Sequence, residues 1–221
     1  MRLYLSSYRI GDRAGSLLAL LGSGKKAAIV ENALDNISPA AREIYRAEAY
    51  DPAVELGSLG IAGAPLDLRD HFGDQAGLRA RLGQFDLVWV TGGNAFVLRR
   101  AMKQSGFDDV ITDMLDNDEI VYGGFSAGAA VAAPSLEGIH LMDDPDEVPA
   151  GYAPEVVWDG LGLIDHAIVP HYRSPHPESG AADRAVRHLG NRGLRYRALR
   201  DGEAIVWTEN RRPGLDARRI A

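Results

Sequence analysis

The sequence predicts an α/β fold: a mostly parallel sheet between two layers of helices, formed as a single domain over residues 1–221. The continuous apolar run 85–93, closed by two glycines, is typical of a strand buried on both faces. The run 119–126 is a second strand of this kind. Helical patterns alternate with such strands along the chain, which favours parallel neighbours joined by helical crossovers.

Each element follows from its own local pattern. Strands are expected at 3–7, 26–33, 64–68, 85–93, 119–126 and 166–172. Helices are expected at 15–24, 38–60, 74–84, 94–106, 107–118, 127–133 and 179–193. Ser38 and Pro39 open the second of these helices as an N-cap and a first helical residue. The last two strands, 195–201 and 204–210, are predicted to form a terminal hairpin.

The segment 135–163 is acidic and rich in glycine and proline, without helical or strand periodicity. We expect it to be a long surface loop or a lid. A loop of this length inside a compact domain is more often functional than a passive connection.

The composition excludes several classes of function. The formal net charge is -7 at pH 7, whereas a groove that follows a phosphate backbone needs a basic surplus. Cysteine is absent, so the chain has neither disulfides nor a thiol nucleophile. The first residues lack the pattern of a signal peptide, and no apolar run is long enough to span a bilayer. We therefore expect a cytoplasmic protein that binds neither nucleic acid nor membranes.

The pentapeptide Gly124-Phe125-Ser126-Ala127-Gly128 lies where a predicted strand meets a predicted helix. In this context a G-x-S-x-G pattern indicates a nucleophile elbow, a strained turn that displays the serine hydroxyl above the sheet edge. Small neighbours are needed because the chain turns sharply there. Ser126 is therefore the predicted nucleophile.

A serine nucleophile needs a base and an acid that orients the base. His171 ends the apolar run "AIVPH" and so lies at the edge of the sheet, while His176 and His188 are expected to be exposed to solvent. For the acid we prefer Asp201, in a turn after the histidine, with Glu203 close by. The rivals Asp143 and Asp144 belong to "LMDDPDE", which is typical of a solvated acidic loop.

A second glycine pair, Gly92-Gly93, ends the strand 85–93. The backbone N–H groups of Gly93 and Ala127 are predicted to form an oxyanion hole above Ser126. The pair does not belong to a dinucleotide fingerprint, and "GSGKK" lacks the spacing of a phosphate-binding loop. We expect no cofactor and no metal.

The stretches "VTGGNAFVLRRAM", "GGFSAGAAVAAPS" and "IVPHYRSPHPES" resemble peptidase E, the aspartyl dipeptidase family, whose fold is similar to that of class I glutamine amidotransferases. The resemblance covers most of the chain. It implies a serine peptidase that cleaves dipeptides with an N-terminal aspartate. It also implies a triad of Ser126, His171 and an acid at Asp201, where the best-known members carry glutamate.

An aspartyl substrate requires a cation for its side chain and polar partners for its ends. Arg173, two residues after His171, is a candidate for a two-pronged carboxylate contact. Asn94 is a candidate for the polar ends of a small peptide. A homodimer is left open by the sequence.

Three other functions compete with a dipeptidase. A cyanophycinase has the same fold and releases aspartyl peptides from a polymer, and a binding or sensor protein would keep the fold without turnover. An α/β-hydrolase esterase ranks lower, because its acid precedes its histidine and an HGGG-type segment lies upstream.

Overall fold

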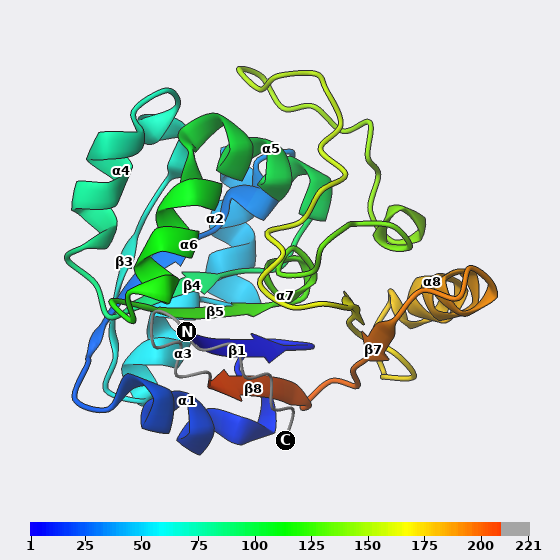
Figure 1. Cartoon of the computed structure of the whole chain (residues 1–221), viewed down its shortest axis with the longest axis horizontal. Coiled ribbons are helices and arrows are strands. Elements are labelled where there is room, and N and C mark those ends of the chain that lie inside the picture. Colours follow the sequence, from blue (N-terminus) through cyan, green and yellow to red (C-terminus); the bar gives the residue numbers. More distant parts are fainter. Residues whose placement is uncertain (209–221) are drawn as a thin grey trace.

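The protein is built on a six-stranded sheet flanked by helices on both faces, as the sequence predicts (Figure 1). The structure, a computed structural model, describes residues 1–208. Within these residues the strand order is β3-β2-β4-β5-β1-β8. All neighbours are parallel except β8, which runs antiparallel to β1. A separate two-stranded parallel sheet joins β6 to β7.

The elements have the following bounds. The strands are β1 (Arg2–Ser6), β2 (Lys26–Val30), β3 (Ala62–Pro65), β4 (Leu87–Val90), β5 (Val121–Phe125), β6 (Ala167–Val169), β7 (Tyr196–Ala198) and β8 (Ala204–Thr208). The helices are α1 (Ala14–Leu21), α2 (Pro39–Glu48), α3 (Pro52–Ser58), α4 (Gln75–Leu82), α5 (Ala95–Ser105), α6 (Phe107–Asp116), α7 (Ala127–Ala130) and α8 (Ser179–Asn191). Within residues 1–208 none of these helices has the length and apolar composition that crossing a membrane requires.

Side chains that alternate along the strands supply two cores, one on each face of the sheet. Leu87 and Trp89 pack into a cluster with residues of α1 and α3. Val88 and Val90 point the other way, into a larger cluster with residues of α4, α5, α6 and α7. Because β4 is buried on both faces, its sequence is a continuous apolar run rather than an alternating one.

The helix predicted over 38–60 is two helices, α2 and α3. Ser38 does cap the first, with its hydroxyl accepting a hydrogen bond from Ala41 N. Asp51 then caps the second by accepting from Ala53 N at 2.8 Å, and Pro52 occupies its first position. A proline in mid-helix removes a backbone donor and clashes with the preceding turn, so the chain ends one helix there and begins another.

The predicted terminal hairpin is wrong. β7 pairs with β6 in the small sheet, whereas β8 pairs with β1 at the edge of the main sheet. The turn between them carries the chain from one sheet to the other, and Asp201 lies in this crossing. The last two residues of the predicted hairpin, 209 and 210, lie outside the described residues.

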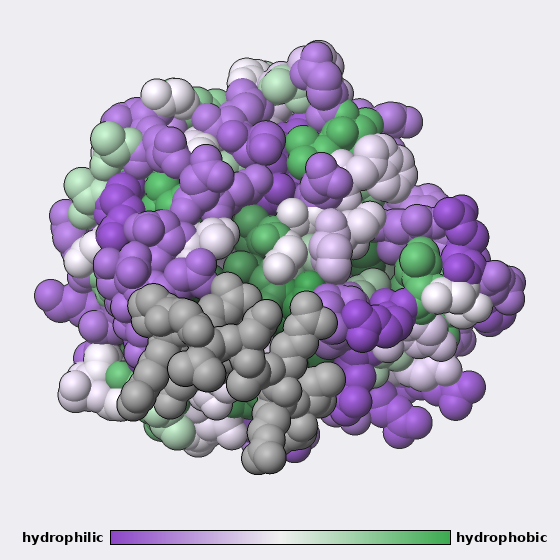
Figure 2. Space-filling view, viewed as in Figure 1, coloured by the Kyte–Doolittle hydropathy of each residue, from purple (hydrophilic) through white to green (hydrophobic). Residues whose placement is uncertain are grey.

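The segment 135–163 is a long surface loop, as expected, with only one short 3₁₀ turn at Ile139–Leu141. Two buried arginines of α5 hold it down. Arg99 donates to the Asp159 carbonyl, and Arg100 donates to the carbonyls of Pro145, Ala153 and Pro154. The face of the molecule in Figure 2 is mostly hydrophilic, with hydrophobic residues exposed in small patches.

Helix α7 is shorter than predicted because the chain after it turns to bond with residues 161–164. Its glycine lies against β4: a Cβ on Gly128 would stand 2.2 Å from the Val90 carbonyl oxygen. We expect Gly128→Ala to destabilise the protein by about 1–3 kcal/mol, because the helix must move away from the strand. Urea unfolding of the purified variant measures this.

Gly57 in α3 is the matched control, since a Cβ there would meet nothing within 4 Å. Gly57→Ala should leave the free energy of unfolding unchanged or raise it by up to about 1 kcal/mol. Equal unfolding midpoints for the two variants would contradict the close approach of α7 to β4.

Candidate active site

Ser126 lies at a strained elbow between β5 and α7. Its φ of 50° and ψ of -117° are rare for a residue with a side chain. The Ser126 N–H donates to the Ser7 carbonyl at 3.1 Å, which fastens the turn to the end of β1. A Cβ on Gly124 would stand 2.7 Å from the Gly128 carbonyl oxygen, so the small residues permit the turn, as predicted.

The structure brings Ser126, His171 and Asp201 into one chain of hydrogen bonds. His171 Nε2 lies 3.1 Å from Ser126 Oγ, and His171 Nδ1 lies 2.8 Å from Asp201 Oδ1. With Nδ1 protonated and bonded to the carboxylate, Nε2 has its lone pair free to accept the serine proton. This is the arrangement of a nucleophile, a base and an orienting acid.

Ser7 connects the base and the acid, and no sequence motif predicts this role. The Ser7 hydroxyl accepts from His171 N at 2.8 Å and lies 2.9 Å from Asp201 Oδ1. Ser7 is fully buried just after β1. A buried serine at a strand end is a weak signal in a single sequence, because most such hydroxyls bond only to nearby backbone.

His171 is almost completely buried, and burial lowers the pKa of its imidazole below the usual 6.5. The hydrogen bond that His171 donates to Asp201 acts in the opposite direction and raises the pKa, while the nearby ring of His176 lowers it. The net effect favours the neutral imidazole. A neutral ring is the form that can accept a proton at neutral pH.

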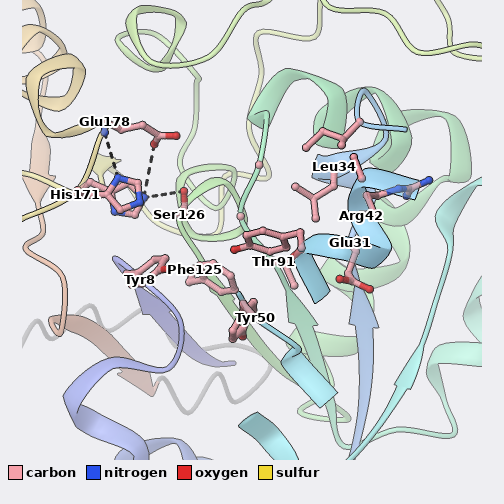
Figure 3. A pocket seen from close by; sticks show the side chains of 16 residues that line it. Tyr8, Glu31, Leu34, Arg42, Tyr50, Thr91, Phe125, Ser126, His171 and Glu178 are labelled. Atoms are coloured by element: carbon pink, nitrogen blue, oxygen red, sulfur yellow. Dashed lines mark hydrogen bonds and ion pairs between the residues drawn. The ribbon is translucent and has the colours of Figure 1, made fainter. Parts of the chain in front are cut away.

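His176 was expected to be exposed, but it is half-buried and stacks on the base. Its ring is 3.7 Å from that of His171, centroid to centroid, with an angle of 7° between the planes. Glu178 follows, with Oε2 3.7 Å from His171 Nε2 (Figure 3). Both side chains come from the loop after β6, and the sequence reasoning missed both as site residues.

The predicted oxyanion donors lie around Ser126. Gly93 has a φ of 134°, and a Cβ there would stand 2.4 Å from the Ala33 carbonyl oxygen. Within residues 1–208, the N–H groups of Gly93 and Ala127 have no hydrogen-bond acceptor. Both donors are therefore free to bond to the oxygen of a reacting carbonyl.

The rival acids lie elsewhere. Asp144 is exposed, as expected for an acidic loop, but Asp143 is partly buried and accepts from Ala95 N at 2.9 Å. Burial raises the pKa of Asp143 to about 7. Glu203 closes its own turn by accepting from Arg200 N at 2.8 Å. Of the candidate acids, Asp201 is the one that bonds to His171.

A cavity of about 280 Å³ opens beside Ser126 (Figure 3). It runs from the His171 ring toward α2 and is lined mainly by apolar and aromatic side chains. None of residues 135–163, all of which the structure describes, lines it. The loop therefore does not cover this cavity as a lid in the structure.

The two predicted substrate-binding residues do not line the cavity. The Asn94 side chain caps α5, with Oδ1 accepting from Phe96 N and Val97 N and Nδ2 donating to the Asp144 carbonyl. Arg173 is exposed, and its guanidinium lies over the Tyr172 ring at 5.0 Å. An asparagine before a helix is also typical of a helix cap, which is the role that the Asn94 side chain has in this structure.

Within residues 1–208, one group of side chains has the composition of a metal site: His171, His176 and Glu178. Their ligand atoms lie within 4.8 Å of one another. The two imidazole planes are nearly parallel, however, so their lone pairs do not converge on one point. His171 Nε2 also faces Ser126. One ring would have to rotate before this group could hold an ion.

The fold is that of peptidase E-like proteins. A solved structure of a peptidase E-like protein from Listeria monocytogenes EGD-e superposes with a TM-score of 0.71 at 23% identity, over 95% of this chain and 98% of that one. A family model described as peptidase family S51 matches residues 39–212, and the chain therefore belongs to this family.

Curated relatives agree with the family assignment. The uncharacterized peptidase Lin0382 of Listeria innocua is 32% identical over 132 residues, which is 59% of this chain and 58% of that protein. Peptidase E of Streptomyces coelicolor is 32% identical over 158 residues, which is 68% of this chain and 60% of that protein. The chain thus spans less than two thirds of the length of either relative.

The titration of His171 tests the electrostatics of the site. We expect the imidazole to titrate below the usual 6.5, because burial disfavours the charged ring. Asp201→Asn should lower the midpoint further, since the carboxylate raises it. NMR titration of the histidine side-chain resonances, assigned with a His171→Gln variant, gives both values. A midpoint above 6.5 in the wild type would contradict the account of burial.

Proposed function

We propose that this protein is a serine-type peptidase that hydrolyses dipeptides or similarly small peptides through an acyl-enzyme. The observation that carries the proposal is the hydrogen-bonded series from Ser126 through His171 to Asp201, set beside a cavity. Membership of peptidase family S51 supports the same class of reaction.

The geometry suggests a mechanism in two halves. Ser126 Oγ attacks the scissile carbonyl carbon while His171 Nε2 takes the hydroxyl proton. The carbonyl oxygen becomes an oxyanion, held by the N–H groups of Gly93 and Ala127. When the C–N bond breaks, His171 gives its proton to the leaving amine, and the acyl group remains on Ser126.

Water completes the cycle. A water molecule gives a proton to His171 Nε2 and attacks the acyl carbon, after which the proton returns to Ser126 Oγ as the acid product leaves. Asp201 keeps Nδ1 protonated throughout and stabilises the imidazolium that forms twice per turnover. Neither half requires a cofactor.

The competing functions predict different outcomes. A non-catalytic relative would bind peptides without turnover, and an esterase would cleave simple esters but not amides. A cyanophycinase-like enzyme would release aspartyl dipeptides from a polymer. A panel of aminoacyl-anilides, one ester and a poly-aspartyl polymer with side-chain arginines distinguishes them.

The identity of the acid is the sharpest test of the proposed triad. We expect Asp201→Asn to lower kcat about 10²–10⁴-fold, because the imidazole loses the partner that sets its tautomer. Asp143→Asn should retain activity within a few-fold, because an amide oxygen can still accept from Ala95 N. Anilide hydrolysis by both variants measures the difference.

Ser126→Ala defines the residual activity without the nucleophile, and its kcat should be several orders of magnitude lower than that of the wild type. Thermal unfolding of each variant separates loss of chemistry from loss of fold. Wild-type activity in Ser126→Ala would end the serine-peptidase proposal. An active Asp201→Asn beside an inactive Asp143→Asn would transfer the role of the acid to Asp143.

A further inference from the structure

We infer that the cavity beside Ser126 selects an apolar or aromatic first side chain, and that Glu178 binds the free α-ammonium group of the same residue. This inference rests on the proposed serine-peptidase function. It differs from the aspartyl preference that the family resemblance implies, and it follows from the lining of the cavity and from where the charges lie.

Aromatic rings form one wall of the cavity. Tyr8 and Tyr50 each stand edge-on to Phe125, with centroids 6.2 Å and 5.6 Å from that of Phe125. The three rings lie together on one side of Ser126 (Figure 3). Aliphatic groups of Leu34, Ile37 and Ala41 line the space toward α2. Surfaces of this kind bind apolar groups by removing them from water.

Helix α2 forms the opposite wall, and none of its residues is buried. Tyr45, at 42% exposure, lines the cavity together with Ala41, and Ile37 just before the helix lines it at 40%. Ala41 and Tyr45 share one face of the helix, since they are four residues apart, and Ile37 continues this surface just before the helix. An apolar side chain of the substrate would cover this face, which no other described part of the chain covers.

Two described arginines lie at or near the cavity, and neither presents an unpaired charge to it. Arg42 is the one arginine or lysine that lines it within residues 1–208, and it is paired with the buried carboxylate of Asp35 at 2.8 Å. Arg9 lies behind the rings of Tyr8 and Tyr50, with its guanidinium carbon 4.9 Å and 4.6 Å from their centroids. Its side chain lines a different depression of the surface. Among the described residues, a substrate carboxylate in this cavity would therefore lose water without gaining a cation.

The carboxylates that line the cavity favour a positively charged group of the substrate. Glu31 is paired with Arg46, but Glu178 has no arginine or lysine partner within residues 1–208. Glu178 Oε2 and Ser126 Oγ both flank His171 Nε2, at 3.7 Å and 3.1 Å. The α-ammonium group of a substrate lies two bonds from the carbonyl carbon that Ser126 attacks. Of the described carboxylates that line the cavity, Glu178 is therefore the one without an arginine or lysine partner, and it lies near the reacting bond. It can pair with the α-ammonium group of the substrate.

Anilides of leucine, phenylalanine and aspartate, together with N-acetyl-leucine anilide, test the inference. We expect kcat/KM for leucine and phenylalanine to exceed that for aspartate by at least about 10-fold. Leucine should exceed N-acetyl-leucine by about 10²-fold, because acetylation removes the charge that pairs with Glu178. Preference for aspartate would overturn the inference and leave the serine peptidase intact. Turnover of none of them would overturn both.

Glu178→Gln tests the ammonium contact. It should raise KM for leucine anilide and reduce the preference over N-acetyl-leucine anilide at least about 10-fold. Glu43→Gln, on the outer face of α2, is the control that removes the same charge and should keep this preference. If Glu178 acted only through His171, both substrates would slow equally and their ratio would stay constant, and that result would overturn the assignment.

Ala41→Phe tests the apolar subsite by filling it. The ratio of kcat/KM for phenylalanine over alanine anilide should fall at least about 10-fold, since the larger side chain loses its space. Ala40→Phe changes the neighbouring exposed residue, which does not line the cavity, and should leave the ratio unchanged. Equal ratios in the two variants would place the first side chain somewhere else.

Discussion

The hydrogen bond between Asp201 and His171 is the interaction on which the rest of the site depends. It joins the loop after β6 to the turn that leads into β8, and Ser7 at the end of β1 fastens both. Ser126, at the end of β5, then meets the other nitrogen of the same ring. Four segments far apart in sequence thus meet at His171, which the main sheet makes possible because β1, β5 and β8 lie side by side.

Two residues of the site have unfavourable backbone conformations, which the well-packed surroundings maintain. Ser126 and His171 both have positive φ values, 50° and 61°, which cost free energy in residues with side chains. Burial of His171 also disfavours its charged form, so the frame must hold a neutral ring against a carboxylate. The two clusters on the faces of the sheet offset these costs. Strain and desolvation at the site are typical of positions where chemistry, rather than stability, determines the residue.

Much of this architecture could be predicted from the sequence. Apolar runs predict the buried strands, and glycines at the ends of these runs indicate the elbow and the turn at Gly93. His171 and Asp201 could be proposed because they follow strands. The pairing of β8 with β1 could not be predicted, since strand pairing depends on contacts between segments that are distant in sequence. Ser7, His176 and Glu178 were also missed, because a side chain that acts through a neighbour leaves no local pattern. Asn94 and Arg173 were proposed from their positions near the site, but the sequence does not show that Asn94 caps α5 or that Arg173 lies over Tyr172.

A fluorophosphonate probe provides a direct test of the proposed triad, because it reacts fastest with a serine that a neighbouring base has activated. Intact-mass and peptide mass spectrometry would show how many probes bind and where. We expect one phosphonyl group per chain, on Ser126, and none after His171→Ala. Labelling of a different residue, or undiminished labelling of Ser126 without the histidine, would contradict it.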